Sequence, residues 1–211
     1  MASGQGVRHD LWTYQTGLAL MRAMKWAGLA AAALAVAAFL AGHRKSIALP
    51  ALALVVGLAV SAVPFEFERR ARSVPRIHDV TTDPRNPPQF SAVSPRPAPY
   101  GGAEVAALQG KGYPDIRPLV LASPPQVAFA RAKDAAEGMG WALVAADPAE
   151  GRLEATARTF WFGFKDDVAV RITPEGTGSR VDVRSVSRVG RSDLGTNARR
   201  IREYLDRVRN Y

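Results

Sequence analysis

The chain has 211 residues, room for one or two domains, with 28 lysines and arginines against 19 acidic residues and a formal net charge of +9. It contains no cysteine, which excludes disulfides, thiolate nucleophiles and zinc–thiolate sites. A basic chain suits nucleic acid or anionic lipid head groups, and two apolar runs favour lipid.

The two uncharged apolar runs occupy residues 27–42 and 47–65. A membrane-spanning helix needs about 20 residues, and the first run reaches this length with Lys25, which can snorkel, and Trp26, which suits the interface. Residues 43–46 leave room only for a tight turn. The sequence therefore predicts a transmembrane hairpin, with spans of about 25–42 and 47–65, in a membrane anchor of residues 1–66. The alternatives are a signal peptide, against which the second run argues, and a buried hairpin of a soluble protein.

Basic residues around the hairpin bear on which side of the membrane the rest of the chain lies. Seven flank the hairpin and two lie in its turn, so the positive-inside rule favours the cytoplasmic side of a multi-pass protein of the bacterial inner membrane. The flanking residues are Arg8, Arg22, Lys25, Arg69, Arg70, Arg72 and Arg76, and those in the turn are Arg44 and Lys45.

Residues 67–112 are rich in proline and glycine, and the prolines between 84 and 99 preclude a long helix there. This stretch is predicted to be an extended linker arm. Within it, residues 77–83 alternate apolar and polar side chains, which is compatible with an additional edge strand of the following domain.

Residues 113–211 are predicted to form an α+β domain of helix, four-stranded antiparallel meander and helix. Ser123 followed by two prolines marks the first helix start, and Gly138 marks its end. Strands are expected at 141–146, 152–162, 167–173 and 180–189, because apolar residues alternate there between short turns. Asp193 is expected to cap the last helix, and both helices are expected to cover one face of the sheet.

Several ordered motifs resemble one known family. They include Ile77-His78-Asp79-Val80-Thr81-Thr82-Asp83, Gly163-Phe164-Lys165-Asp166-Asp167-Val168, Asp182-Val183-Arg184-Ser185-Val186-Ser187-Arg188 and Ser192-Asp193-Leu194-Gly195-Thr196-Asn197. The chain is similar to the bacterial and plastid family called domain of unknown function 1499 from about residue 75 onward. The resemblance implies no established activity and supplies no catalytic residues. Some relatives carry a lipoprotein signal, which implies an extracytoplasmic domain and conflicts with the charge count.

Three arginines are candidate ligands for an anion. If the third and fourth strands pair, Arg171, Arg184 and Arg188 share one outward face, and guanidinium groups bind carboxylate or phosphate with two parallel hydrogen bonds. The alternative is an ion-pair network that fixes the last helix. The accompanying polar cluster, structural or binding, consists of Asp166, Asp167, Asp182, Ser185, Ser187, Asp193 and Asn197.

The sequence offers little for catalysis. His78, Asp79 and Asp83, joined by Asp166 and Asp167, have the donor types of a metal-assisted hydrolase, although their spacing does not require a metal. No phosphate loop or dinucleotide motif occurs, so no cofactor is expected, and no histidine suits a serine hydrolase. The aromatic strand end around Trp161 could contact lipid or a partner, or pack within the fold.

The sequence therefore favours a non-enzymatic binding or scaffolding module of the cell envelope, held at the membrane by its hairpin. The expected partners are membrane lipid, an anionic ligand or another envelope protein, rather than nucleic acid. The metal-assisted hydrolase is the alternative, with His78 and the aspartates as its ligands.

Overall fold

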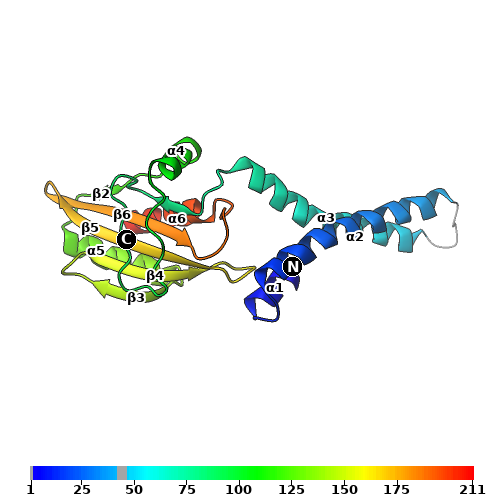
Figure 1. Cartoon of the computed structure of the whole chain (residues 1–211), viewed down its shortest axis with the longest axis horizontal. Helices are drawn as coiled ribbons and strands as arrows, with labels where there is room; N and C mark the ends of the chain where they lie inside the picture. The colour runs from blue at the N-terminus through cyan, green and yellow to red at the C-terminus, as the bar shows by residue number, and fades with distance from the viewer. Residues whose placement is uncertain (1, 42–46) are drawn as a thin grey trace. The chain divides into compact units, whose positions relative to one another are not determined.

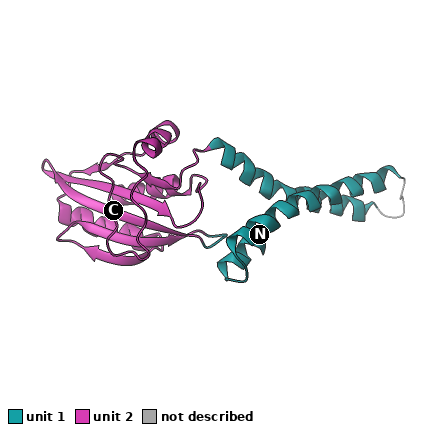
Figure 2. Cartoon of the chain, in the orientation of Figure 1, with its two compact units in different colours: residues 1–73, 160–163 teal, residues 74–159, 164–211 magenta. Residues whose placement is uncertain are grey.

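The computed structural model describes residues 2–41 and 47–211. The predicted turn at 43–46 and Gly42, the last residue of the first predicted span, lie outside the described residues. The chain divides into two compact units, coloured separately in Figure 2. The first comprises residues 1–73 with 160–163, and the second comprises residues 74–159 with 164–211.

The first unit consists mainly of helices α1 (Ala2–Arg8), α2 (Tyr14–Leu40) and α3 (Ala48–Ser73), drawn blue to cyan in Figure 1. Helices α2 and α3 are each long and apolar enough to cross a membrane. Only 17% of the most apolar window of each helix is buried, so most of their apolar side chains are on the surface.

Small residues let α2 and α3 approach each other closely. Gly28 and Ala32 of α2 pack against Gly57 of α3, where a Cβ atom would lie 2.5 Å from the Gly28 carbonyl oxygen. The Ser61 hydroxyl donates across the pair to the Lys25 carbonyl at 3.0 Å. Close packing of this kind replaces the hydrophobic effect as the cohesive force between helices in lipid.

The second unit contains a six-stranded antiparallel sheet. Its main path runs β1 (Asp79–Thr81), β6 (Gly178–Ser187), β5 (Lys165–Glu175), β4 (Arg152–Arg158) and β3 (Ala142–Asp147), and β2 (Leu119–Leu121) pairs with the same edge of β6 as β1. The predicted meander is present as β3 to β6, and the compatible edge strand is present as β1. The expected count of four strands was wrong because two three-residue strands also pair with β6.

Two helices cover one face of the sheet, as expected. Helices α5 (Pro125–Gly138) and α6 (Thr196–Asn210) enclose the main core with the apolar side chains of that face (Figure 1). We call this the helix face. Alternation placed Leu153, Val170 and Val183 on it correctly, and all three are fully buried. The helix start differs slightly from the prediction, because Pro124 rather than Ser123 is the N-cap residue of α5.

The predicted linker arm is largely part of the second unit. Helix α4 spans Gly102–Gly112, where an extended arm was expected, and its Gln109 side chain bonds both the amide and the carbonyl of Thr81 in β1. Helix α3 continues to Ser73, and the second unit begins at residue 74. Residues 82–101 contain neither helix nor strand, which agrees with the proline-based expectation.

Residues 84–98 cross the other face of the sheet, and we call them the strap and the covered face. Phe90 and Val93 of the strap form a second apolar cluster with Ala169 and Val186. This burial explains why Glu154, which alternation along its strand places on the face opposite Leu153, is completely buried.

Candidate functional site

Strand register divides the predicted polar cluster between the two faces of the sheet. In β5 and β6, Asp167 is opposite Val186 and Arg171 is opposite Asp182, whereas Asp166 is opposite Ser187. Opposite residues of an antiparallel pair point to the same side. Arg171, Arg184 and Arg188 therefore share the covered face with Asp167 and Asp182, as parity predicted. Asp166, Ser185 and Ser187 point to the helix face, Asp193 precedes α6 and Asn197 lies in it, so the cluster is not one site.

Arg171 lies in a compact group of two arginines and two aspartates on the covered face. Its Nη2 atom is 3.0 Å from Asp182 Oδ2 and 3.2 Å from Asp83 Oδ2. Arg180, which was not among the sequence candidates, bonds the same Asp182 carboxylate through Nε at 3.0 Å. Two positive charges are thus matched by two negative ones.

Arg184 is enclosed, with 1% of its side chain exposed. Its guanidinium group forms two hydrogen bonds with Asp79 and donates a third to the Ala98 carbonyl at 2.8 Å. The aromatic rings of Phe90 and Tyr100 lie close to the same group. Arg184 therefore holds β1 and the strap together and presents no guanidinium surface to a ligand from solution.

Arg188, the residue after β6, is paired but only partly buried. It forms a two-point pair with Asp167, from Nε and Nη2 at 2.8 Å each, while Thr156 also donates to that carboxylate. Hydrogen bonding to Asp167 raises the pKa of the Arg188 guanidinium, although its partial burial acts in the opposite direction. About a quarter of the Arg188 side chain remains exposed.

The helix face holds a separate buried network that joins α6 to the sheet. Arg200 of α6 donates to Asp166 at 2.6 Å and to the Ser185 hydroxyl at 3.0 Å. Asn197 donates to the Ser187 hydroxyl at 3.0 Å and to the His78 carbonyl at 2.9 Å. Ion pairing does fix the last helix, but through Arg200 rather than the three predicted arginines.

The N-cap residue of α6 is Gly195 rather than the expected Asp193, although the Asp193 side chain still binds the start of the helix. The Asp193 carboxylate accepts from the amides of Gly195 at 2.9 Å and Asn197 at 2.7 Å. Burial raises the pKa of the Asp193 carboxyl, although these two hydrogen bonds act against the rise. The role that the geometry gives Asp193 is structural.

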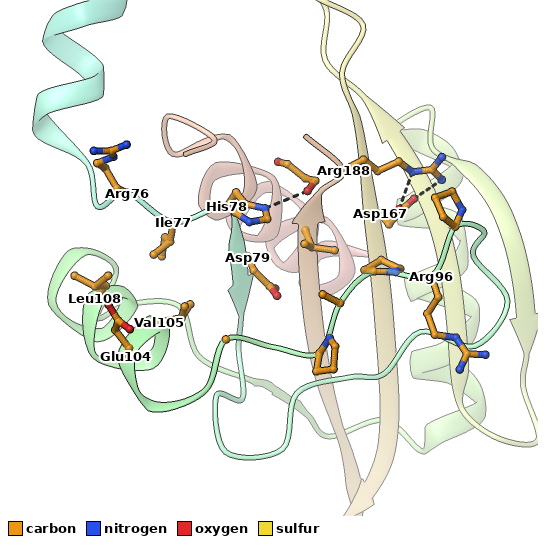
Figure 3. A pocket seen from close by; sticks show the side chains of 17 residues that line it. Arg76, Ile77, His78, Asp79, Arg96, Glu104, Val105, Leu108, Asp167 and Arg188 are labelled. Carbon is orange, nitrogen blue, oxygen red and sulfur yellow. Dashed lines mark hydrogen bonds and ion pairs between the residues drawn. The ribbon is translucent and has the colours of Figure 1, made fainter. Parts of the chain in front are cut away.

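A pocket with a volume of about 490 Å³ opens beside the end of β6 (Figure 3). We call it the His78 pocket. His78 lies on one wall, with its Nδ1 atom 3.1 Å from the Ser187 carbonyl, and Val105 and Leu108 of α4 lie on another. Much of the remaining lining is apolar and comes from residues 95–99 of the chain.

The anchored ring of His78 has one nitrogen available for a ligand. When Nδ1 donates to the Ser187 carbonyl, Nε2 of the neutral ring is an acceptor, and protonation would make it a donor. Nε2 makes no hydrogen bond to any residue that the structure describes. His78 and Arg188 are far apart in the sequence, and no motif linked them. The structure places both in the lining of this pocket.

The predicted metal ligands do not assemble. Within residues 2–41 and 47–211, no three His, Asp or Glu side chains are grouped as a metal site would require. Asp79 is bonded to Arg184, and Asp83 to Arg171 and Arg180. Asp166 and Asp167 point to opposite faces of the sheet because they are neighbours in one strand.

Glu154 is the carboxylate that sequence reasoning missed. It accepts from the Ser91 amide at 2.8 Å, the Ser91 hydroxyl at 2.7 Å and the amides of Ala92 and Val93 at 2.9 Å each. Burial alone would raise the pKa of the Glu154 carboxyl, but these bonds together lower it below its ordinary value. Glu154 fixes the strap on the covered face.

Comparison with known families places this domain. The model of the family described as "Protein of unknown function (DUF1499)" matches residues 79–208, more than half of the chain. The chain belongs to this family. The resemblance found in the sequence is confirmed. The DUF1499 match begins with β1 and ends in α6, so it includes the strap and α4.

Other comparisons add little to the DUF1499 assignment. No significant match was found among curated proteins. Among solved structures, the chain is similar to TTHA0849 from Thermus thermophilus, with 16% identity over 43% of this chain and 93% of that chain, at a TM-score of 0.26.

Proposed function

We propose that this DUF1499 protein is a membrane-anchored, non-enzymatic binding protein whose second unit takes an anionic, partly apolar ligand into the His78 pocket. The observation that supports this proposal most is the pocket itself. It combines apolar walls with the Nε2 atom of His78, which has no described hydrogen-bond partner, and with the exposed part of the Arg188 side chain. Its volume lies within the range of about 300–1,000 Å³ that small-molecule sites occupy.

Membrane anchoring is supported by the apolar side chains that α2 and α3 expose on their surfaces. The core helices of a soluble protein are mostly buried, whereas 17% of the apolar window of each of these helices is buried. Leu34, Leu52 and Val55 each expose more than half of their surface. Exposed apolar area of this extent is stable in hydrocarbon and unfavourable in water.

The charge balance of the pocket lining favours an anion. Asp79 is neutralised by Arg184 and Asp167 by Arg188. The lining then has two further cations, Arg76 and Arg96, and one further anion, Glu104. None of these three forms an ion pair with a described residue. Protonation of His78 would add another positive charge.

The arrangement supports binding rather than catalysis. A general acid or base needs a pKa tuned toward the working pH and a second group within hydrogen-bonding reach of the same substrate atom. In the His78 pocket the carboxylates Asp79 and Asp167 are each held in two-point bonds to an arginine. Neither of these two carboxylates bonds the His78 ring, whose hydrogen-bond partner is the Ser187 carbonyl.

Calorimetric titration of the full-length protein in dodecyl maltoside tests the pocket. The test compounds are benzyl phosphate, which has an anionic group and an apolar ring, inorganic phosphate and benzyl alcohol. We expect benzyl phosphate to bind at least tenfold more tightly than the other two, because only it meets both parts of the lining. Equal affinities for the three compounds would contradict the proposal.

Variants locate the binding. The double substitution His78→Gln with Arg96→Ala should weaken benzyl phosphate binding at least tenfold. Arg117→Ala is the matched control, since Arg117 is also exposed and bonds only to a backbone carbonyl, that of Pro114, as Arg96 does to Ser91. Anchoring is tested separately by extracting membranes with alkaline carbonate, where protein in the supernatant would contradict it.

A further inference from the structure

The connection between β4 and β5 exposes two large aromatic side chains. Phe160 is 70% exposed and Trp161 is 45% exposed, and their rings meet edge to face with centroids 5.0 Å apart. The other Phe and Trp side chains with large exposure in the described chain are Trp26, Phe39 and Phe65. All three lie on the apolar helices α2 and α3. Among the described Phe and Trp side chains, large exposure is thus confined to this tip and to the proposed membrane anchor.

Two cations flank this aromatic tip along the chain. Arg158 and Lys165 face each other at the end of the β4–β5 ladder, and both are exposed. Neither forms an ion pair with any described residue. The acidic neighbours Asp166 and Asp167 are buried and bonded to arginines, so they do not offset this charge at the surface.

The tip is grouped with the first unit. Residues 160–163 cluster with the N-terminal helices, and Figure 2 colours them accordingly. Within that unit, Arg8 Nη1 donates to the Phe160 carbonyl at 2.8 Å, and the Arg8 guanidinium lies 5.9 Å from the centroid of the Phe160 ring. A third cation therefore lies beside Phe160.

We propose that the β4–β5 tip, with Phe160 and Trp161 at its centre, inserts into the head-group region of an anionic membrane. This inference rests on the proposed membrane anchoring. Tryptophan favours the membrane–water interface, where its ring lies in an apolar environment and its N–H group reaches water, and phenylalanine adds apolar area to bury there. Adjacent lysines and arginines are attracted to the negative charge of anionic lipid head groups.

Spin labels can test the insertion because the chain has no native cysteine. Single substitutions Trp161→Cys, Val144→Cys and Val56→Cys are labelled in the full-length protein. The protein is reconstituted in vesicles of equal phosphatidylglycerol and phosphatidylcholine. Val144 is the matched control, since it is 45% exposed, as Trp161 is, and it lies on edge strand β3. Val56 reports on α3 in the bilayer.

Collision rates with oxygen and with a water-soluble nickel chelate give the depth of each label. We expect the label at position 56 deep in the bilayer, that at 161 at head-group depth and that at 144 in water. If 161 matches 144 while 56 is deep, the tip inference fails and the anchor stands. If 56 is also in water, both fail. If 161 is shielded from both reagents, a protein rather than lipid covers the tip, which overturns the inference.

Charge reversal provides a second measurement. Arg158→Glu combined with Lys165→Glu should move the label at 161 toward water, with at least a threefold higher collision rate with the chelate. Arg85→Glu combined with Arg117→Glu makes the same change in net charge at two exposed arginines elsewhere and should leave the label unchanged. Equal effects of the two pairs would overturn the electrostatic part of the inference.

Discussion

Asp79 and Arg184, 105 residues apart in the chain, form a two-point ion pair, with Nε 3.0 Å from Oδ1 and Nη2 2.7 Å from Oδ2. The side chains are 11% and 1% exposed. Because Arg184 also bonds the Ala98 carbonyl, this pair joins β1, β6 and the strap. It therefore replaces the predicted anion site at Arg184 with a structural contact between distant segments.

Removing the carboxylate from this pair should be strongly destabilising. Asp79→Ala leaves the Arg184 guanidinium buried without its counter-charge, and losing one partner of a buried pair costs about 3–5 kcal/mol. Thermal unfolding of the full-length protein in detergent, followed by circular dichroism, measures the loss. Glu137→Ala is the control, because the exposed pair of Glu137 with Lys133 contributes about 0.5 kcal/mol or less. Comparable losses for the two variants would show that Asp79 and Arg184 are not buried as described.

Glu154→Gln should loosen the strap. A carboxamide cannot accept at both ends, so at least one of the donors from Ser91, Ala92 and Val93 would be left unpaired, at a cost of about 1–3 kcal/mol. We expect trypsin to cleave the variant several-fold faster after Arg85, which Asn86 follows; Arg96 precedes Pro97 and is not a trypsin site. Exposed Glu104 supplies the control through Glu104→Gln, which should not change the cleavage rate. An unchanged rate in Glu154→Gln would mean that these bonds do not hold the strap.

The same carboxylate predicts a dependence on pH. The pKa of Glu154 is lowered in the fold from its ordinary value of 4.5. A lowered pKa means that the ionised group stabilises the fold fully above 4.5 and loses this effect as the pH falls through the folded pKa. The difference in melting temperature between wild type and Glu154→Gln should therefore be constant from pH 7 to about 5 and shrink below 4.5. A difference that grows on acidification would contradict the assigned hydrogen bonds.

Alternation of apolar residues with a period of two predicted which residues face the core, because residues two apart in a strand point to the same face of the sheet. Leu153, Val168 and Val181 are all in the core, as the pattern indicated. Parity also predicted that Arg171, Arg184 and Arg188 share a face. Both results follow from backbone geometry, which a sequence reports directly.

Burial of the covered face could not be predicted in the same way. From its strand alone, Glu154 has the pattern of a solvent-facing residue. The residues next to it in the sequence do not indicate its partner Ser91, which lies 63 residues away. Helix α4 was not predicted from the sequence because it has glycines at both ends and at Gly110, which lower helix propensity. Strand β2 has three residues, too few to show a period. Each of these features depends on long-range contacts that leave no local signal.

The close approach of α2 and α3 gives the last prediction, in which one chemical change has opposite effects at two helical sites. At Gly57, a Cβ atom would lie 2.5 Å from the Gly28 carbonyl oxygen and 3.0 Å from the Ala32 amide nitrogen. Backbone atoms cannot rotate away, so Gly57→Ala must separate the helices, and overpacking of this kind costs about 1–3 kcal/mol.

Gly110 in α4 is the matched site, because a Cβ atom there meets nothing within 4 Å. Gly110→Ala should stabilise the protein by about 0.5–1 kcal/mol, since alanine restricts the unfolded chain and favours helix. Melting curves of both full-length variants in dodecyl maltoside test the pair, with Gly57→Ala expected below wild type and Gly110→Ala above it. A neutral Gly57→Ala would mean that α2 and α3 do not pack through their small residues in the detergent-solubilised protein.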